Sequence, residues 1–360
     1  MVHNAADIKR VIIRVDISER IGGGHFMRMI GLGQFLFDNG YEIHFACIPY
    51  QVDVIKSLLD SSFILHLISD KKENTEQSDL EGLLTLADEL QPNWIIIDGY
   101  HFTVGYEQGL KSKGFRLVRV DDLPRQRCVA DVLINQNHGS EFFDHEISTS
   151  TIKLAGLRYL LLRREFRQID IDHKKPEKKG SLKLLVCLGA GSAIMDGINT
   201  KIVKAISELE GVFSRATIIL GKMGVLTDEI LELKRTASFD INIIKYHPYI
   251  STEMLEADVA ITAGGYSMWE LLYLKTPYIV ISLNDAQDKY TRFLASEGLC
   301  DALGMYESIT HESIKSALES FVENEAYRKE ILLKSEVLLD RNNNGKKILQ
   351  ILANKYNFNS

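Results

Sequence analysis

Cysteines are few in this sequence, and their spacing does not suit metal binding. Four occur among 360 residues, none of them as a C-x-x-C pair, and three lie in or beside apolar runs. This spacing excludes the common zinc signatures. It favours buried free thiols in a reducing compartment instead. The four residues are Cys47, Cys128, Cys187 and Cys300.

Long apolar runs and long basic runs are also missing. Residues 1–7 have no apolar core of the signal-peptide type, and no apolar stretch approaches the length of a membrane span. The formal net charge is −7, and aromatic residues do not alternate with basic ones. We therefore expect a cytoplasmic protein that neither inserts stably into a membrane nor binds nucleic acid. No oligomeric state is predicted.

What is present is the composition of a soluble globular enzyme, at a length that suits two domains. Apolar residues make up 45% of the chain and charged residues 25%. Strand-like and helix-like patterns alternate along nearly the whole chain, which predicts βαβ units and parallel, doubly wound sheets. The predicted strands are residues 11–15, 41–47, 63–67, 94–98, 115–120, 131–135, 182–188, 216–220, 241–245, 259–262 and 278–282.

A polar segment divides this alternation in two. Residues 168–181 have little apolar content, a composition that cannot form a core and suits a domain boundary. We expect a Rossmann-like domain over 1–167, a linker over 168–181, a second Rossmann-like domain over 182–340 and a C-terminal helix over 341–360. Two such domains suggest the α/β fold called GT-B, with parallel sheets facing across a cleft. A periplasmic-binding-protein-like pair would alternate similarly but would need an export signal.

A glycine-rich turn joins the first predicted strand to the first predicted helix. Gly22, Gly23 and Gly24 follow the strand, and His25 stands where helical spacing begins. Glycines let the backbone approach a ligand closely, and a helix N-terminus presents N–H groups to an anion. His25 adds a side chain that exchanges a proton near neutral pH. The turn predicts an anion site with a general base, although an ordinary turn with an incidental histidine would look the same. Its spacing is not the G-x-G-x-x-G of dinucleotide-binding folds.

Two further glycine turns follow predicted strands in the second half. The first contains Gly189 and Gly191, and the second spans residues 264–267 at the start of a helix. Ligands of doubly wound sheets bind beyond the carboxyl ends of the strands, so the N–H groups of the second turn suit a diphosphate. Glu270, one turn further along the helix, has a carboxylate suited to accept hydrogen bonds from both hydroxyls of a ribose. The alternative is that its charge only interacts favourably with the dipole of its helix. The second turn consists of Gly264, Gly265, Tyr266 and Ser267.

Other polar residues also follow predicted strands. Asn284 and Gln287 come after the strand at 278–282 and suit contacts to sugar or phosphate. Tyr246 follows residues 241–245, where the backbone suits a base edge. In the first half, Asp98 and Tyr100 end another strand, at the sheet edge that also carries His25. Polar residues at such turns often only cap or bend the chain.

Taken in order, these segments resemble the hydrolases of pseudaminic acid biosynthesis. That family cleaves UDP-2,4-diacetamido-2,4,6-trideoxy-β-L-altropyranose and shares the GT-B architecture of the glycosyltransferase MurG. Residues 14–28 are similar to its opening, R-x-D-x-S…I-G-x-G-H-x-M-R, and Asp98 with Tyr100 to its D-x-Y element. The turn at 189–192 departs from the usual G-G-x-D. Further similar segments are residues 121–123, 135–137, 162–167, 263–265, 269–270 and 284–287.

The resemblance implies hydrolysis of a UDP-sugar at its anomeric carbon, in the biosynthesis of a pseudaminic-type acid or related surface glycan, with no metal and no cofactor. His25 would be the general base that activates water. Tyr100 would position water or sugar, and Asp16 would orient His25 or bind a sugar hydroxyl. A GT-B glycosyltransferase, with His25 deprotonating an acceptor, is the alternative, and a non-catalytic nucleotide-sugar-binding protein would need no base. Arg28, Asp98 and Asn137 would join the glycine turns in binding substrate.

Overall fold

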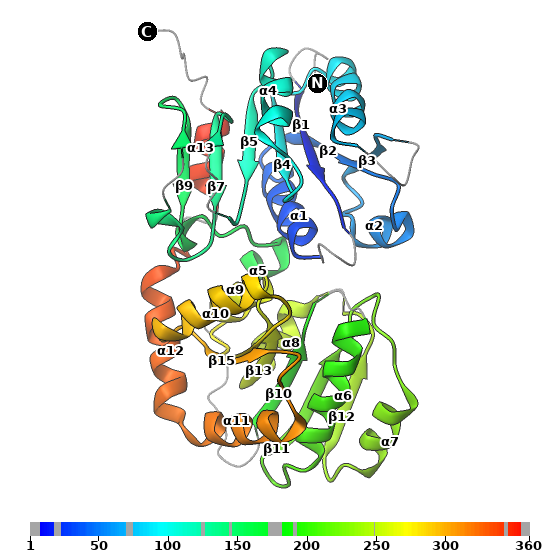
Figure 1. Ribbon diagram of the computed structural model, residues 1–360, viewed down its shortest axis with the longest axis vertical. Helices are drawn as coiled ribbons and strands as arrows, with labels where there is room; N and C mark the ends of the chain where they lie inside the picture. The colour runs from blue at the N-terminus through cyan, green and yellow to red at the C-terminus, as the bar shows by residue number, and fades with distance from the viewer. Residues whose placement is uncertain are drawn as a thin grey trace. The chain divides into compact units, whose positions relative to one another are not determined.

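The chain folds into two compact units, each with its own parallel sheet (Figure 1). One unit contains Met1–Arg164 together with Asp340–Ser360, and the other contains Glu165–Leu339. The computed structural model describes residues 8–17, 23–69, 75–123, 127–143, 146–171, 182–189, 193–247, 249–341 and 345–353.

The sheet of the first unit has the order β3-β2-β1-β4-β5-β7-β9, and every neighbouring pair is parallel. After β1, the chain adds β2 and then β3 on one side of that strand. It then crosses to the other side of β1 and adds β4, β5, β7 and β9 there. This reversal is the switch point beside which doubly wound sheets bind ligands. The strands are β1 (Lys9–Val15), β2 (Tyr41–Cys47), β3 (Ile64–Leu67), β4 (Trp94–Asp98), β5 (Leu117–Val120), β7 (Val132–Asn135) and β9 (Ile152–Ala155), beside a small pair β6 (Arg127–Cys128) and β8 (Glu146–Ile147).

Helices cover both faces of this sheet because its strands are apolar on both sides. In β1, Val11, Ile13 and Val15 belong to one core, which also contains residues of α1, and Ile12 to the other, which contains residues of α3 and α4. The last helix, α13, joins the first of these cores through Ile348 and Leu352. The helices are α1 (Gly24–Phe37), α2 (Val52–Leu58), α3 (Glu76–Leu90), α4 (Val104–Ser112) and α13 (Lys346–Ala353), with short 3-10 turns at Ser140–Phe142 and Leu157–Tyr159.

The second unit repeats this plan with the strand order β12-β11-β10-β13-β14-β15, again parallel throughout. Its switch point therefore lies between β10 and β13. The strands are β10 (Leu182–Cys187), β11 (Phe213–Ile219), β12 (Asp240–Ile244), β13 (Val259–Ala263), β14 (Tyr278–Ser282) and β15 (Asp301–Met305). The helices are α5 (Arg164–Gln168), α6 (Ala193–Ser207), α7 (Asp228–Thr236), α8 (Ile250–Glu256), α9 (Ser267–Tyr273), α10 (Asp285–Ser296), α11 (His311–Glu323) and α12 (Glu325–Leu338).

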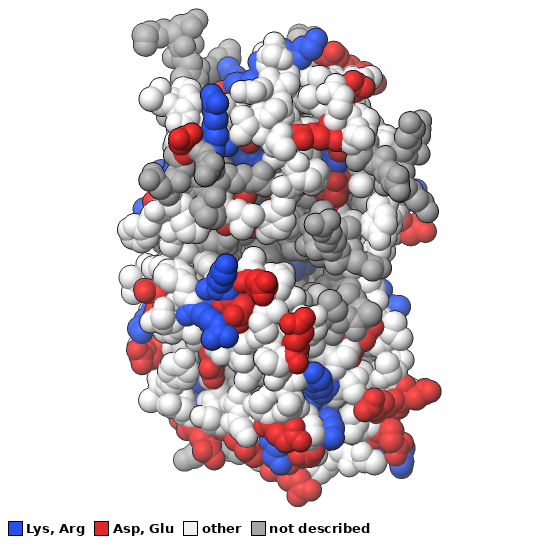
Figure 2. Space-filling model, in the orientation of Figure 1, with Lys and Arg blue, Asp and Glu red and all other residues white. Residues whose placement is uncertain are grey.

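The surface carries charges of both signs. Figure 2 shows Lys and Arg side chains interspersed with Asp and Glu over the face that it presents. In the described parts of the chain, no helix combines the length and the hydropathy that a bilayer crossing needs.

All four cysteines are free and buried, as predicted. Burial is the first cause that raises the pKa of each thiol to about 12, which leaves them unreactive at neutral pH.

Candidate active site

Polar side chains gather at the carboxyl ends of β1, β4 and β5 in the first unit. His25 stands in the first turn of α1, which follows β1, Asp98 is the last residue of β4, and Asp122 follows β5. Because β1 and β4 are neighbours, with Val15 beside Asp98, these residues meet at the switch point of the sheet. Doubly wound sheets bind their ligands at this position.

His25 is held by a buried carboxylate. Its Nδ1 lies 2.6 Å from Asp98 Oδ1, and the Asp98 side chain has no exposed surface. Nδ1 also lies 2.9 Å from Arg28 Nη2, which can only donate, but the carboxylate contact is shorter and a carboxylate only accepts, so Nδ1 carries a proton and donates it to Asp98. Nε2 is then the nitrogen with a lone pair that can take a proton from another group. Asp98 thus selects the tautomer that a general base needs, as the carboxylate of a catalytic triad does.

Arg28, one turn further along α1, neutralises part of the charge of this carboxylate. Its Nε donates to Asp98 Oδ2 and its Nη2 to Asp98 Oδ1, both at 2.6 Å. Such two-pronged pairs fix geometry as well as charge. The remaining terminal nitrogen, Nη1, donates to Asp122 Oδ1 at 2.6 Å. Arg28 therefore links the ends of β4 and β5 to the helix that carries His25.

Tyr100 and Asn137 complete the cluster around Asp122. The Tyr100 hydroxyl donates to Asp122 Oδ2 at 3.3 Å, and Asn137 Nδ2 donates to Asp122 Oδ1 at 3.1 Å. The Tyr100 ring also meets the His25 ring edge-on, with 4.6 Å between ring centroids. The structure thus brings five of the predicted residues together: His25, Arg28, Asp98, Tyr100 and Asn137.

The surroundings of Asp98 and Tyr100 fix the protonation of these two side chains. Burial alone would raise the pKa of Asp98, but the Arg28 guanidinium, followed by His25, holds it well below its usual value. Burial, and then the negative charge of Asp122, raises the pKa of Tyr100. At neutral pH, Asp98 is therefore ionised and Tyr100 is a neutral phenol that can donate a hydrogen bond.

Asp16 belongs to a separate cluster at the end of β1. It accepts a hydrogen bond from Arg14 Nη2 at 2.7 Å and another from the backbone N–H of Ile48 at 3.0 Å. Its Oδ2 also lies 3.7 Å from His101 Nε2. The contact with His25 that we expected from Asp16 is made by Asp98.

Asp16, Asp79 and His101 are close enough to one another to hold a metal ion, but their surroundings suit an ion-pair cluster better. Arg14 pairs with both carboxylates, and its Nε donates to Asp79 Oδ1 at 3.0 Å. The Tyr106 hydroxyl donates to the same oxygen at 2.6 Å. A cation would have to displace a fully buried guanidinium. The cluster therefore ties β1 to α3 and α4.

Sequence reasoning missed the role of Asp122 and the partners of Arg14. Asp122 was included only in the family-similar segment 121–123, with no role assigned, and its pairing with Arg28 depends on β5 lying beside β4. A signal existed for Arg14, because a charged residue within an apolar strand needs a buried partner. For Asp122 the signal was its position after a predicted strand, on the same sheet edge as His25.

In the second unit, glycine turns follow the two strands at the switch point. Gly189 follows β10 with φ +120°, a conformation that favours glycine. A Cβ on Gly264 would lie 2.9 Å from Thr291 Cγ2, so packing against α10 requires that glycine. A Cβ on Gly265, in contrast, would meet nothing within 4 Å. Packing does not explain Gly265, and the open space beside it suits a ligand group.

The other predicted residues of this unit lie in the segments that follow its strands. Tyr266 precedes α9 and Ser267 begins it. Glu270 is 2% exposed. Burial, and to a lesser extent the charge of Glu270, raise the pKa of Cys187 at the end of β10. Tyr246 follows β12 and has Lys222 Nζ 4.1 Å from its ring centroid.

Asn284 and Gln287 cap the first turn of α10. Asn284 Oδ1 accepts a hydrogen bond from the backbone N–H of Gln287 at 3.0 Å, and Gln287 Oε1 accepts one from Leu283 N–H at 2.9 Å. These two hydrogen bonds engage the side-chain oxygens of Asn284 and Gln287, so a ligand would be bound by their side-chain N–H groups. Of the four remaining predicted glycines, Gly23 caps α1 and Gly24 begins it, whereas Gly22 and Gly191 lie outside the described residues.

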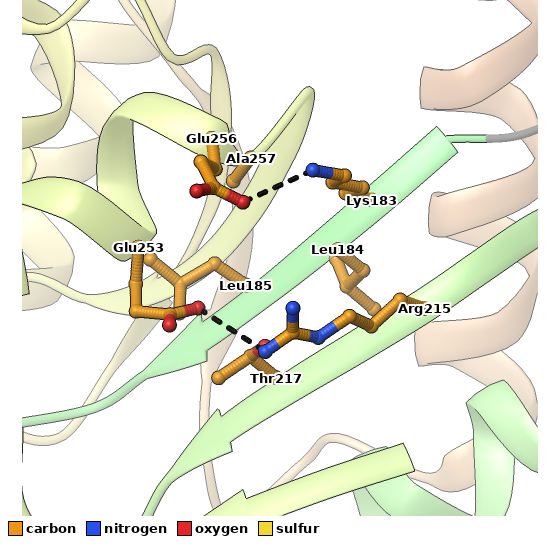
Figure 3. Close-up of a pocket in the computed structure, with 8 residues that line it drawn as sticks. All are labelled: Lys183, Leu184, Leu185, Arg215, Thr217, Glu253, Glu256 and Ala257. Carbon is orange, nitrogen blue, oxygen red and sulfur yellow. Dashed lines mark hydrogen bonds and ion pairs between the residues drawn. The ribbon is translucent and has the colours of Figure 1, made fainter. Parts of the chain in front are cut away.

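A small pocket in the second unit lies away from these turns (Figure 3). It is lined by residues of β10 and β11, and by residues at the end of α8. Two ion pairs border it, Lys183 with Glu256 at 3.0 Å and Arg215 with Glu253 at 3.8 Å. The glycine turns lie at the opposite, carboxyl ends of the strands, so this pocket is not part of the candidate nucleotide site.

Comparison with known proteins identifies a domain in the second half of the chain. Residues 185–340 match the model of the Glycosyltransferase family 28 C-terminal domain. Uncharacterized protein MJ1062 of Methanocaldococcus jannaschii is 26% identical over 288 residues, which make up 77% of this chain and 56% of that protein. The chain thus spans about half the length of this curated relative.

Solved structures with the same fold cover nearly the whole chain. MurG of Acinetobacter baumannii aligns with a TM-score of 0.68 at 13% identity, over 96% of this chain and 99% of MurG. The glycosyltransferase SnogD from Streptomyces nogalater has a TM-score of 0.62 at 14% identity, over 96% and 100%. The glycosyltransferase VinC, solved in complex with dTDP, has 0.60 at 12%, over 96% and 99%. The predicted fold is confirmed: this chain has the two-domain GT-B fold with parallel sheets, and its residues 185–340 match the family 28 C-terminal domain.

Proposed function

We propose that this chain is a UDP-sugar hydrolase in which His25 activates water for attack on the anomeric carbon. The observation that carries the proposal is the 2.6 Å contact between His25 Nδ1 and Asp98 Oδ1, which leaves Nε2 as the basic nitrogen. The GT-B fold and the family 28 domain support a nucleotide sugar as substrate. In this proposal the domain that carries the base spans residues 1–167, and the domain that binds UDP spans residues 182–340.

The chemistry follows from the tautomer. As the oxygen of water bonds to the anomeric carbon, Nε2 of His25 takes a proton from that water. The bond between the anomeric carbon and the diphosphate oxygen breaks, and UDP leaves with the electron pair. Asp98 stabilises the imidazolium that forms, in the way the carboxylate of a triad does. UDP is a stable anion, so the reaction needs no strong general acid, and direct attack inverts the anomeric centre.

The nucleotide would bind at the glycine turns of the second unit. The open space beside Gly265 supports a diphosphate there, where backbone N–H groups can approach it. Glu270, in the first turn of α9, would accept hydrogen bonds from the ribose hydroxyls. The motif resemblance supports a UDP-diacetamido-trideoxy-hexose, a precursor of a pseudaminic-type acid or related surface glycan, as the sugar.

A second candidate is glycosyl transfer to an acceptor hydroxyl. MurG aligns over nearly the whole chain, and SnogD and VinC are named glycosyltransferases. In that reaction Nε2 of His25 would take the proton of the acceptor instead of a proton of water. The two candidates share the base, the nucleotide and the leaving group, and they differ in the nucleophile.

Acceptor-free turnover tests the proposal. The full chain is incubated with UDP-2,4-diacetamido-2,4,6-trideoxy-β-L-altropyranose, and with UDP-N-acetylglucosamine as a comparison sugar, and released UDP is measured. We expect rapid UDP release without acceptor, and free sugar in solution. UDP release that requires an added acceptor, with the sugar attached to it, would establish the transferase instead.

His25→Ala tests the base in the same assay. Loss of a general base costs about 10²–10⁴-fold in kcat, while UDP affinity measured by calorimetry should stay unchanged because the nucleotide site is in the other unit. Near-normal turnover in this variant would exclude His25 as the base.

A further inference from the structure

Two hydrogen-bond acceptors face each other beside the buried cluster. Asp122 Oδ2 lies 4.0 Å from His25 Nε2, which is too far for a direct hydrogen bond. In the neutral imidazole that a general base requires, Nδ1 donates to Asp98 and Nε2 carries no proton, and an ionised carboxylate has none to give. The two atoms therefore suit a molecule that donates two hydrogen bonds from one oxygen.

We infer that His25 and Asp122 together hold the attacking water, which makes Asp122 a second catalytic residue and a determinant of water over alcohols. A water with hydrogen bonds of about 2.8 Å to both atoms would see them at roughly 90°, near the angle between its own O–H bonds. Both of its hydrogens are then engaged, and its lone pairs point away from both acceptors. The inference rests on the proposed function and extends it to the choice of nucleophile.

An alcohol fits the same pair of acceptors poorly. Its hydroxyl has one hydrogen, so it can satisfy either His25 Nε2 or Asp122 Oδ2 but not both. An alcohol that donates to His25 Nε2 leaves Asp122 Oδ2 with the Tyr100 hydroxyl at 3.3 Å alone, one hydrogen bond fewer than with water, in a site where the side chain of His25 is 7% exposed and that of Asp122 18%. The hydrogen bond that the alcohol lacks costs free energy in a site largely closed to solvent. The geometry therefore favours hydrolysis over transfer to an acceptor hydroxyl.

Asp122 is anchored in a way that aims one oxygen at His25. Its Oδ1 accepts hydrogen bonds from Arg28 Nη1 at 2.6 Å and from Asn137 Nδ2 at 3.1 Å. Its Oδ2, which faces Nε2, has the Tyr100 hydroxyl at 3.3 Å. A carboxylate fixed through one oxygen presents the other in a defined direction, and pre-positioned groups of this kind accelerate reactions.

The charges also suit a proton transfer from water to His25. Two carboxylates, Asp98 and Asp122, face one guanidinium, Arg28, so the cluster carries one net negative charge while His25 is neutral. When an O–H bond of the water breaks, its proton goes to Nε2 and its oxygen bonds to the anomeric carbon as UDP leaves. The imidazolium then neutralises the cluster, and its new N–H points toward Asp122.

The choice of nucleophile can be measured with Asp122→Asn. The full chain and the variant hydrolyse UDP-2,4-diacetamido-2,4,6-trideoxy-β-L-altropyranose in water containing methanol, and the ratio of methyl glycoside to free sugar is determined. We expect free sugar almost alone from the unmodified chain. The variant should lose about 10–100-fold in kcat with little change in KM, and its share of methyl glycoside should rise severalfold.

Asp121→Asn is the matched control, because Asp121 pairs with Arg119 at 3.3 Å and accepts from Leu123 N–H at 3.1 Å, away from His25. Its kcat and product ratio should stay normal. Should Asp122→Asn fail to fold, Asp122→Ala with added formate replaces it, and formate should restore part of kcat. An unmodified chain that releases no UDP without acceptor would refute the proposed function. A hydrolytic chain whose folded Asp122 variants keep a normal kcat and product ratio would overturn this inference alone.

Discussion

At the scale of single residues, Asp98 decides which nitrogen of His25 is basic. Asparagine has the same size, but it is a weaker acceptor and can turn an N–H toward Nδ1, so His25 can adopt the unproductive tautomer. Asp98→Asn should therefore lower kcat by about 10³–10⁴-fold, measured as UDP release under saturating substrate. Asp131→Asn, which removes a carboxylate paired with Lys111 at 2.6 Å, should leave kcat unchanged. A loss below tenfold in folded Asp98→Asn would contradict this role.

The same carboxylate links stability to pH. Burial raises the pKa of Asp98, but Arg28 and His25 outweigh burial, so its pKa is lower in the folded protein than in the unfolded chain. As the pH falls, the unfolded chain takes up its proton first, near a pH of about 4. The contribution of Asp98 to stability is complete above that pH and is lost as the pH falls toward the folded-state value.

Urea unfolding at several pH values measures this contribution. Between about pH 5 and pH 3, the free energy of unfolding should fall more steeply for the unmodified chain than for Asp98→Asn. Equal slopes would show that the Asp98 carboxylate is not stabilised by its partners in the folded state.

The sequence could identify His25 because its signal is local: three glycines, then a histidine at the start of a helical pattern. The Asp98 contact depends on two segments 73 residues apart. The contact of Asp16 with His25 was expected from the family resemblance, which offered a bond to a sugar hydroxyl as the alternative. That expectation missed that β4 is the neighbour of β1, and that Arg14 engages Asp16.

At the scale of elements, α1 packs closely on the segment that leaves the first unit. A Cβ on Gly31 would lie 2.8 Å from the backbone carbon of Leu162 and 2.9 Å from the nitrogen of Arg163. Gly31→Ala should destabilise the protein by about 1–3 kcal/mol, because backbone must move. Gly197→Ala in α6, where a Cβ would meet nothing within 4 Å, should stabilise it by about 0.5–1 kcal/mol. Thermal unfolding of the two variants checks both signs, and equal effects would refute the close packing.

Strands with a strong apolar pattern could be predicted from the sequence, whereas strands whose conformation depends on pairing with a neighbouring strand could not. Apolar runs such as 41–47 and 94–98 are strands with those limits. The edge strands β9 and β15 were not predicted. β15 contains Gly304 at φ +99° and pairs with an irregular register, so its sequence shows no regular alternation. Its strand conformation depends on the neighbouring β14.

At the scale of the whole molecule, the end of the chain returns to the first unit. Trp94 Nε1 donates to the carbonyl of Leu352 at 3.0 Å, and Ile348 is 1% exposed in the core beneath α1. The sequence predicted a helix here, but an apolar helix face does not say which sheet it covers. The order of elements along the chain would have placed it with the second unit.

Ile348→Ala should therefore destabilise the first unit by about 2–5 kcal/mol. UDP affinity should persist, since the glycine turns lie in the second unit. Gln350→Ala, an exposed change on the same helix, should alter stability by less than about 0.5 kcal/mol. Urea unfolding with calorimetric UDP titration measures both quantities. A harmless Ile348→Ala would show that α13 does not stabilise the first unit.

Hydrolysis in ¹⁸O-water tests most directly whether His25 activates water for attack on the anomeric carbon of a UDP-sugar. The unmodified chain turns over UDP-2,4-diacetamido-2,4,6-trideoxy-β-L-altropyranose without acceptor, while His25→Ala serves as the comparison. We predict that the label appears on the anomeric oxygen of the free sugar, that UDP stays unlabelled, and that the first product has the inverted anomeric configuration. Label in UDP would mean attack at phosphorus, and labelled sugar formed equally fast by His25→Ala would contradict the role of the base.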